Sequence, residues 1–599
     1  MALLVSVVYL TWRAGFTLGT DLWISIPLWL LEIYAAVGLG LFTFSLWNLD
    51  SVRPAREAHE IDLLIAVLIP TYNEPAAVLL PTIAAAVALE PTHETWVLDD
   101  GERPWVAELA ATLGANYLAR TEHAHAKAGN VNYALEHIEA DVLAILDADH
   151  VATEGFLTHT LGYFDDPKLA VVQTPQDFYN ADSFEHDRNR SWFWRDRRDV
   201  SFSEQGLFYR GIQPGKNRWG AAFWCGTNAL VRTTALREVG GVAHESVTED
   251  IHTTIRIHRR GWRTVYHNEV LAYGLAAKDA DQYQTQRVRW GTGAMQVMHQ
   301  EHPLTGSGLT LTQRVAYAAT LLGWFDAWRT LGYVLVPMAV VFSGANPIHA
   351  PAVTFLVAFG ITFTLQRIAI GLLSRGYAPQ GLAMLFEFIR MQANITATLT
   401  YLHRGERAFK VTAKAGSDGR ARQQVPGLLV GLIVLTASAT IWFGATVAGL
   451  TPVHYDVRWT AYGAVFWMMF NALMLISAAA RIRSERFASD RRSSVRLTSG
   501  GAVQLDGTIS QLLDVSVGGA LVRATGAPTD GGFHELRIQL DDEVVVLRCV
   551  ERSRQPVGAG GALVGLQFTG GQDRAVAELS IRLISGAIDR RPLAQSPAA

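Results

Sequence analysis

The chain has 599 residues, 49% of them hydrophobic, and a mean hydropathy of +0.15. This length exceeds that of one ordinary domain, and the hydropathy is too high for a soluble protein of this size. A formal net charge of −4 gives no indication of a nucleic-acid partner. The two cysteines, Cys225 and Cys549, form neither a disulfide framework nor a zinc signature. We therefore expect a membrane protein with soluble parts.

Two apolar segments lie within residues 1–50. Residues 24–47 are almost uncharged and are followed by Arg53 and Arg56, so this span should end on the cytoplasmic side. Residues 1–19 form a shorter first span. A signal peptide is the alternative, but the sequence shows neither a basic stretch before the apolar run nor a small-residue cleavage site after it. We therefore favour a retained helix.

Four further spans are predicted within residues 312–480, at 315–342, 350–374, 426–449 and 460–480. Residues 381–402 mix charged and amide side chains with apolar ones, a pattern that predicts an amphipathic interfacial helix. Residues 403–425 carry six arginine and lysine residues, which the positive-inside tendency assigns to the cytoplasm. Six spans in total leave both soluble regions on the cytoplasmic side.

The polar block at residues 60–300 has the pattern of an α/β domain. Apolar strands are expected at 63–69, at 95–98 and before Asp147, with helices at 76–89 and 104–113 between them. Strands that alternate with helices form a parallel sheet, and ligands bind at the carboxyl ends of its strands. A dehydrogenase would share this pattern. It is disfavoured because the first strand is not followed by Gly-x-Gly-x-x-Gly.

Asp147 and Asp149 follow the third of these strands. Two carboxylates at a strand end offer hard oxygen ligands to a divalent cation that clamps a diphosphate. The same tripeptide also occurs as a turn or a helix cap. The pair alone therefore does not establish a metal site.

Four motifs occur in the order Asp99-Asp100-Gly101, Asp147-Ala148-Asp149, Thr248-Glu249-Asp250 and Gln286-Arg287-Val288-Arg289-Trp290. This series, flanked by apolar segments of membrane length, resembles the processive family 2 glycosyltransferases of the bacterial cellulose synthase type. The resemblance implies an α/β GT-A-type cytoplasmic glycosyltransferase domain inserted between transmembrane helices. It also implies inverting transfer of glucose from UDP-glucose to a growing β-glucan chain, at the bacterial inner membrane.

The resemblance also implies the two catalytic roles. Asp250 is expected to be the general base that removes the proton of the acceptor hydroxyl. First-turn acids that favour the helix dipole, with Thr248 as N-cap, are the alternative. Arg289 is expected to neutralise charge on the leaving UDP, and Trp290 offers a flat apolar face to a pyranose ring. A core tryptophan beside a surface arginine is the alternative there.

Binding residues are implied in the same way. The donor-binding set is Asp99, Asp100, Lys127, Asp147, Asp149 and Gln286, with Mg²⁺ or Mn²⁺ at Asp147 and Asp149. The acceptor-binding set is Trp290, Phe223, Trp224, Cys225 and Gly226. The family usually has Phe-Phe-Cys-Gly-Ser in this last segment. The departures at Trp224 and Thr227 therefore bear on the identity of the polymer.

Residues 484–590 have short alternating strands, such as 543–547, and many glycines, which predicts a β-barrel. Arg492, Arg496, Asp514, Ser516 and Gly519 match the Arg-x-x-x-Arg and Asp-x-Ser-x-x-Gly signature of PilZ domains, and Arg491 precedes its first arginine. That resemblance implies cyclic di-GMP as an allosteric activator. A basic cluster on lipid headgroups is the alternative for the arginines alone. The tail at 591–599 is expected to be disordered.

Phe409, Val411 and Thr412 match the Phe-x-Val-Thr gating loop of cellulose synthases, which covers the donor site. Several points stay open at this stage. The polymer is expected to be cellulose, with curdlan or a mixed-linkage glucan as alternatives. UDP-N-acetylglucosamine is an alternative donor, and an inactive cyclic di-GMP receptor is an alternative class. The lipid bilayer is an expected partner, and the need for a periplasmic accessory subunit stays open.

Overall fold

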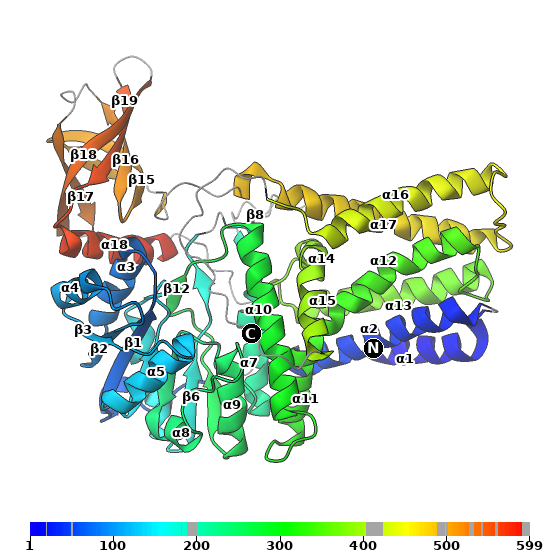
Figure 1. The fold of residues 1–599 in the computed structure, drawn as a ribbon, viewed down its shortest axis with the longest axis horizontal. Helices are drawn as coiled ribbons and strands as arrows, with labels where there is room; N and C mark the ends of the chain where they lie inside the picture. The colour runs from blue at the N-terminus through cyan, green and yellow to red at the C-terminus, as the bar shows by residue number, and fades with distance from the viewer. Residues whose placement is uncertain are drawn as a thin grey trace.

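The computed structural model describes residues 1–19, 21–49, 52–180, 183–188, 201–402, 423–487, 497–498, 501–525, 532–540, 543–557 and 561–589. Figure 1 shows three parts: an α/β domain, a bundle of long helices that extends from one side of it, and a β-barrel above it. A helix at the end of the chain lies between the barrel and the α/β domain.

The α/β domain is built on a seven-stranded sheet with the order β11-β6-β10-β4-β1-β2-β3. Its strands are β1 (Ile65–Thr71), β2 (Glu94–Asp99), β3 (Asn116–Ala119), β4 (Val142–Ile145), β6 (Leu169–Gln173), β10 (Ala229–Arg232) and β11 (Arg263–Tyr266). All are parallel except β10, which runs antiparallel to its neighbours β4 and β6. The predicted parallel sheet is thus confirmed with one reversed strand.

Both faces of this sheet are covered by helices. Side chains alternate across a strand, and Val67 and Ile69 of β1 pack with α3 (Ala76–Val87) and α4 (Pro104–Leu113). Ala66 and Leu68 face α5 (Ala126–His137) and α8 (Thr233–Glu238). Burial on both faces explains the continuous apolar run of β1, all of whose residues are buried.

Two smaller sheets lie beyond the main one. β5 (Val151–Ala152) pairs with β12 (Ala272–Gly274), which also pairs with β7 (Asp177–Phe178). β8 (His186–Arg188) pairs with β9 (Ser201–Ser203). β5 follows Asp149 by one residue, so the first of these sheets supports the segment that carries the acidic pair.

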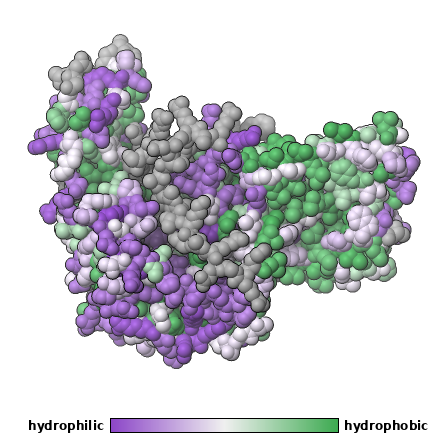
Figure 2. Space-filling model, in the orientation of Figure 1, coloured by the Kyte–Doolittle hydropathy of each residue, from purple (hydrophilic) through white to green (hydrophobic). Residues whose placement is uncertain are grey.

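The bundle contains α1 (Ala2–Trp12), its continuation η1 (Arg13–Thr17), α2 (Leu22–Leu46), α12 (Asp326–Ser343), α13 (Ala352–Leu373), α16 (Gly427–Val447) and α17 (Arg458–Ile482). Five helices of the described chain are long and apolar enough to span a membrane, and residues 2–17 form a shorter apolar helix. Figure 2 shows that hydrophobic residues cover this bundle, whereas the α/β domain is largely hydrophilic.

Arg13 lies inside this apolar environment because it has a partner on the next helix. Its Nε is 3.1 Å from Oε2 of Glu32, whose Oε1 accepts a hydrogen bond from the Tyr9 hydroxyl at 2.9 Å. Arg13 is fully buried. Because a buried charge is tolerated when it is paired, this contact links α1 to α2.

The predicted span at 315–342 lies within Leu311–Ser343, one of the five segments apolar and long enough to span a membrane. The structure divides this segment into α11 (Leu311–Leu322), a short turn at Gly323–Phe325 and α12. Tyr317 of α11 is buried, and its hydroxyl forms a hydrogen bond with Nδ1 of His258 in the α/β domain at 2.8 Å. α11 therefore packs against the α/β domain as well as against α2 of the bundle.

The predicted helix at 381–402 is divided in the structure. α14 (Gln380–Ile389) and α15 (Met391–Leu399) meet at Arg390, and a short turn follows at 400–402. α14 contacts α17 of the bundle, whereas α15 contacts α10 (Ala280–Glu301) of the α/β domain. In Figure 1 the two helices stand between α10 and the bundle. The segment thus joins the two parts of the molecule.

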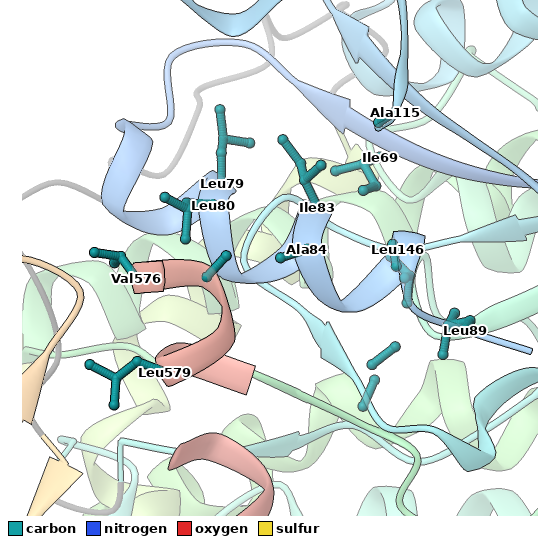
Figure 3. Close-up of a cluster of buried hydrophobic side chains, with 14 of the residues drawn as sticks. Ile69, Leu79, Leu80, Ile83, Ala84, Leu89, Ala115, Leu146, Val576 and Leu579 are labelled. Carbon is teal, nitrogen blue, oxygen red and sulfur yellow. The ribbon is translucent and has the colours of Figure 1, made fainter. Parts of the chain in front are cut away.

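The predicted C-terminal β-barrel is confirmed. It consists of β13 (Leu497–Thr498), β14 (Ala502–Leu505), β15 (Thr508–Ser516), β16 (Gly519–Thr525), β17 (Phe533–Leu540), β18 (Glu543–Val557) and β19 (Gly561–Phe568). β15 pairs with both β14 and β16, which closes the sheet. After the barrel, α18 (Asp573–Asp589) packs on α3 and α4, with Val576 near Leu80 (Figure 3).

Candidate functional site

One cavity of about 1620 Å³ lies where the carboxyl ends of the parallel strands meet the helix bundle. Most of the predicted donor, acceptor and catalytic residues line it: Asp100, Lys127, Asp147, Asp149, Phe223, Cys225, Gly226, Asp250, Gln286, Arg289 and Trp290. Residues of α2, α11, α12, α13 and α14 complete the wall. The cavity thus extends from the sheet edge into the bundle.

Lys127 and Asp147 form the polar centre of the cavity. Nζ of Lys127 is 2.5 Å from Oδ1 of Asp147 and donates to the Gly226 carbonyl at 2.6 Å. The backbone N–H of Asp147 donates to Oγ1 of Thr227 at 2.8 Å. The lysine therefore ties the strand end that carries Asp147 to the predicted acceptor segment.

Asp147, Asp149 and His150 each offer a ligand atom within 4.8 Å of one another. Asp149 is 3% exposed, and its Oδ1 is 3.2 Å from Nδ1 of His150. Among the described residues, Nε2 of His150 has no hydrogen-bond partner. Two carboxylates beside an open cavity fit a Mg²⁺ or Mn²⁺ ion, which prefers oxygen ligands and shares its shell with phosphates.

Sequence reasoning did not single out His150. Its ring packs directly on Gly274 of β12, where a Cβ would overlap the ring. Its position next to Asp149 was the available signal, but a histidine after an acidic pair carries no specific meaning in a sequence. The position of the His150 ring depends on the pairing of β12 with β5, which brings Gly274 against it.

Asp99 differs from the prediction. Its side chain is fully buried, and its oxygens accept hydrogen bonds from the Arg103 guanidinium at 2.8 Å and the Tyr117 hydroxyl at 3.1 Å. It therefore anchors Arg103 and does not line the cavity. Asp100 does line it, and its carboxylate is held by Arg120, whose Nε is 2.5 Å from Oδ1.

Trp224 also differs from the prediction. Its side chain is 1% exposed and lies in the core beside Leu68 and Val131, because its large apolar surface is buried under the sheet. Its backbone N–H donates to Oγ1 of Thr254 at 3.1 Å. The departure from the family pattern at this position therefore falls in the core, and the cavity is lined by its neighbour Phe223.

Asp250 lies in the first turn of α9 (Glu249–Arg259) and faces the cavity. Burial and the nearby charge of Glu249 raise the pKa of Asp250 to about 7, although the Ile251 N–H and the charge of Lys127 oppose the shift. Ile251 N–H donates to Oδ1 at 2.7 Å. A carboxylate with such a pKa is matched to general-base work near neutral pH.

A glycine is needed at position 226, where the acceptor segment approaches Lys127 and Asp250. Its φ is +85°, a backbone conformation that glycine adopts easily. A Cβ at Gly226 would lie 3.3 Å from Oδ2 of Asp250. The acceptor segment, Lys127 and the predicted base thus converge within a few ångströms.

Gln286, Arg287, Arg289 and Trp290 of α10 all line the cavity, and Arg287 is the one whose side chain is buried. The Arg287 guanidinium lies 4.9 Å from the centre of the Trp290 ring. Arg287 also forms an ion pair with Glu204. A second ion pair joins Glu204 to Arg390 at the break between α14 and α15.

Glu204 and Arg390 were missed by sequence reasoning because ion pairs between residues far apart in sequence leave no local pattern. Glu204 is 6% exposed in its side chain and connects the segment after β9, the α10 motif and the α14–α15 break. Arg287 stands inside the Gln286–Trp290 motif, and its ion pair with Glu204 anchors α10. Glu204 is therefore a positioning residue for the three motif side chains.

Several predicted residues lie outside the described part of the chain: Phe409, Val411, Thr412, Arg491, Arg492 and Arg496. The rest of the PilZ signature is described. Asp514 and Ser516 are in β15, Gly519 begins β16, and the Ser516 hydroxyl donates to the Gly519 carbonyl at 3.1 Å. These three residues stand at the β15–β16 turn, away from the cavity.

Replacement of Glu204 tests this network. Glu204→Ala leaves two arginines without their carboxylate, and loss of one partner of a buried ion pair costs about 3–5 kcal/mol. We expect the thermal transition of the detergent-solubilised protein to fall clearly, as followed by tryptophan fluorescence. Glu139→Ala, at an exposed glutamate, is the matched control. Equal transitions for the two variants would show that the network contributes no stability.

Two family models match the chain: glycosyltransferase like family 2 over residues 62–293, and cellulose synthase over residues 231–387. A mannosyltransferase from Pyrobaculum calidifontis, solved with GDP-Man and Mn²⁺, is 15% identical over 68% of this chain and 100% of its own, with a TM-score of 0.43. That similarity is too distant to carry conclusions about the site.

Two curated relatives cover most of the chain. Cellulose synthase 1 of Komagataeibacter xylinus is 32% identical over 91% of this chain, which spans only 36% of that relative's length. The UDP-forming cellulose synthase catalytic subunit of Pseudomonas fluorescens (strain SBW25) is 34% identical over 85% of this chain and 70% of its own length. This chain belongs to the family of bacterial cellulose synthase catalytic subunits.

Proposed function

We propose that this protein is a processive, inverting glycosyltransferase that polymerises glucose from UDP-glucose into cellulose. The observation that carries the proposal is the convergence of Asp250, the Asp147–Asp149 pair and the Gln286–Trp290 motif on one cavity. Membership of the cellulose synthase family supports the donor and the product. The chain spans about a third of the length of the first relatives it matches. The activity, the substrate and the partners of the whole protein are therefore proposals.

The donor end of the cavity supplies charge for a nucleoside diphosphate. Asp147 and Asp149 would hold Mg²⁺ or Mn²⁺, which neutralises the diphosphate when bound. Lys127, beside Asp147, and Arg289 add positive charge from the protein. Positive groups placed where the leaving UDP gains negative charge stabilise the transition state.

Asp250 would act on the acceptor. As the acceptor hydroxyl oxygen bonds to the anomeric carbon of glucose, the bond from that carbon to UDP breaks and the hydroxyl proton passes to the Asp250 carboxylate. A single displacement inverts an α-linked donor into a β-linkage. Trp290 and Phe223, both on the cavity wall, would hold the acceptor sugar ring by apolar contact.

Asp250→Asn tests the base. We expect synthesis to fall roughly 10²–10⁴-fold, the scale of general-base catalysis, while UDP still binds. Because the pKa of Asp250 is about 7 and the base acts when deprotonated, wild-type synthesis should decline as the pH falls below 7. Radiolabelled-glucose incorporation measures the rate across this range. Wild-type activity in Asp250→Asn would exclude Asp250 as the base.

Asp149→Ala should instead weaken metal-dependent UDP binding.

The bundle end of the cavity would receive the polymer. Tyr34, Phe42 and Gln366 line it from α2 and α13, and Arg329 lines it from α12. Arg329 is held by Asp326 at 2.6 Å. Aromatic and polar side chains together suit a glucan, whose sugar rings have apolar faces and hydroxyl edges. We propose that the chain crosses the bacterial inner membrane through the bundle, with the catalytic domain and the barrel in the cytoplasm.

Product analysis tests the reaction itself. Membranes that carry this protein alone should convert UDP-glucose into a polymer whose linkage analysis gives β-1,4-glucose. Other glucose linkages would indicate curdlan or a mixed-linkage glucan, and incorporation from UDP-N-acetylglucosamine would change the donor. Synthesis only after a periplasmic subunit is added would make that subunit a partner. No incorporation from any UDP-sugar, with or without that subunit, would support an inactive receptor.

We propose that cyclic di-GMP binds the barrel as a PilZ domain and activates synthesis by releasing the predicted gating loop. The described Asp514, Ser516 and Gly519 support the PilZ assignment by their place at one turn. Arginine suits such a ligand because guanidinium pairs bidentately with phosphate and with guanine.

Two arginine substitutions test this regulation. Arg492→Ala or Arg496→Ala should abolish cyclic di-GMP binding in calorimetry, and the one that tethers the loop should also give activity without the nucleotide. Allosteric coupling of ~1–3 kcal/mol corresponds to roughly 5- to 150-fold activation. Identical synthesis with and without cyclic di-GMP, in protein that binds it, would contradict the gating proposal.

A further inference from the structure

A second cluster of metal-ligating side chains lies on the surface of the α/β domain, apart from the cavity. It contains His159, after α6 (Gly155–Thr158), and His267 and Glu269, after β11. Oε2 of Glu269 is 3.0 Å from Nδ1 of His159 and 2.9 Å from Nε2 of His267. Two imidazole nitrogens therefore converge on a single carboxylate oxygen.

The hydrogen bonds of His267 determine which of its nitrogens carries a proton. The Tyr163 hydroxyl donates to the Val52 carbonyl at 2.7 Å and lies 2.9 Å from Nδ1 of His267. Because the hydroxyl has one proton and gives it to Val52, Nδ1 must donate to the Tyr163 oxygen. In neutral His267 the lone pair of Nε2 then points toward Oε2 of Glu269. Two lone pairs at 2.9 Å repel each other unless a metal ion or a proton lies between them.

The arrangement has the features of a zinc site. Zinc binds histidine nitrogen and carboxylate oxygen at about 2.0–2.2 Å, which in a tetrahedron separates ligand atoms by about 3.3 Å. The observed separations of 2.9 and 3.0 Å need to open by only a few tenths of an ångström. The Tyr163 hydroxyl orients His267, as outer partners of metal-binding histidines commonly do.

The local backbone holds the ligands in place. The ring of His159 packs over Gly155, where a Cβ would lie 2.9 Å from Cε1 of the ring. The side chains of His159 and Glu269 are 50% and 47% exposed, so an ion could enter from solvent and keep a water as its fourth ligand.

The cluster lies behind the segment that carries the acidic pair. From Asp149 the chain runs through β5 to His159, while His267 and Glu269 precede β12. β5 and β12 pair, and the Thr153 N–H donates to the Leu271 carbonyl at 2.8 Å. An ion bound to the cluster would therefore fasten the two chain segments that support Asp149 and His150.

We propose that His159, His267 and Glu269 bind one zinc ion, or a similar divalent transition metal, as a structural clip. This site is separate from the proposed Mg²⁺ or Mn²⁺ site at Asp147 and Asp149. It differs in chemistry as well, because two imidazole ligands favour zinc over magnesium. The proposal does not depend on which sugar the enzyme transfers.

Zinc titration of the full-length detergent-solubilised protein tests the proposal. The protein is first stripped with a chelator, and excess Mg²⁺ occupies the cavity. We expect His159→Ala and Glu269→Gln each to lose one equivalent of bound zinc and the zinc-dependent rise in thermal transition seen in wild type. Tyr163→Phe should keep the site but weaken zinc binding about 10–100-fold, the usual effect of losing an outer partner.

His137→Ala is the matched control, since His137 is exposed and lies outside the cluster. It should bind zinc as the wild type does. His159 and Glu269 are half-exposed, so their variants should unfold at the wild-type temperature when zinc is absent; should one of them fail to fold, the other carries the test. Equal zinc stoichiometry and affinity in wild type, His159→Ala and Glu269→Gln would overturn the proposal. The cluster would then be an imidazolium–carboxylate ion pair.

Discussion

The buried carboxylate of Glu204 holds the site together, because it pairs with Arg287 of α10 and with Arg390 at the α14–α15 break. α10 must present Gln286–Trp290 to the cavity while it also touches the helices that lead into the bundle. A charged triad in a nearly buried position has few alternative arrangements, since each unpaired charge would be costly. The Gln286–Trp290 motif and the helices that lead into the bundle are thereby fixed to one another.

Charge balance also sets the properties of the cavity. Lys127 lies against Asp147, and its charge opposes the rise in the pKa of Asp250. Because burial and Glu249 outweigh that charge, Asp250 has a pKa of about 7 and can both take up and release a proton near neutrality.

At the other end of the domain, α18 packs on α3. α3 begins soon after β1, whose end, Thr71, lines the cavity, so α18, the helix that follows the barrel, contacts an element close to the cavity.

The sequence alone determined much of this architecture. The apolar run at 63–69 predicted a strand of a parallel sheet, and β1 is buried on both faces because a parallel strand covered by helices has no solvent side. The apolar segments α13 and α16 were recognisable from their length and hydropathy. The acidic and Arg–Trp motifs identified the members of the site, since each motif is local and its order along the chain is specific. The alternating strands of the C-terminal region predicted the barrel for the same local reason.

Tertiary structure decided how these residues are used. Asp99 and Trp224 belong to motifs, yet one is enclosed by Arg103 and Tyr117 and the other lies in the core, because burial depends on what packs above a residue. The apolar run at 315–342 gave no sign of its interruption at Gly323–Phe325 or of the contact that Tyr317 makes with the α/β domain. Glu204 and the cluster at His159 join residues distant in sequence. Such contacts exist only after the chain has folded, since hydrogen bonds and ion pairs between remote segments leave no periodicity or spacing to read.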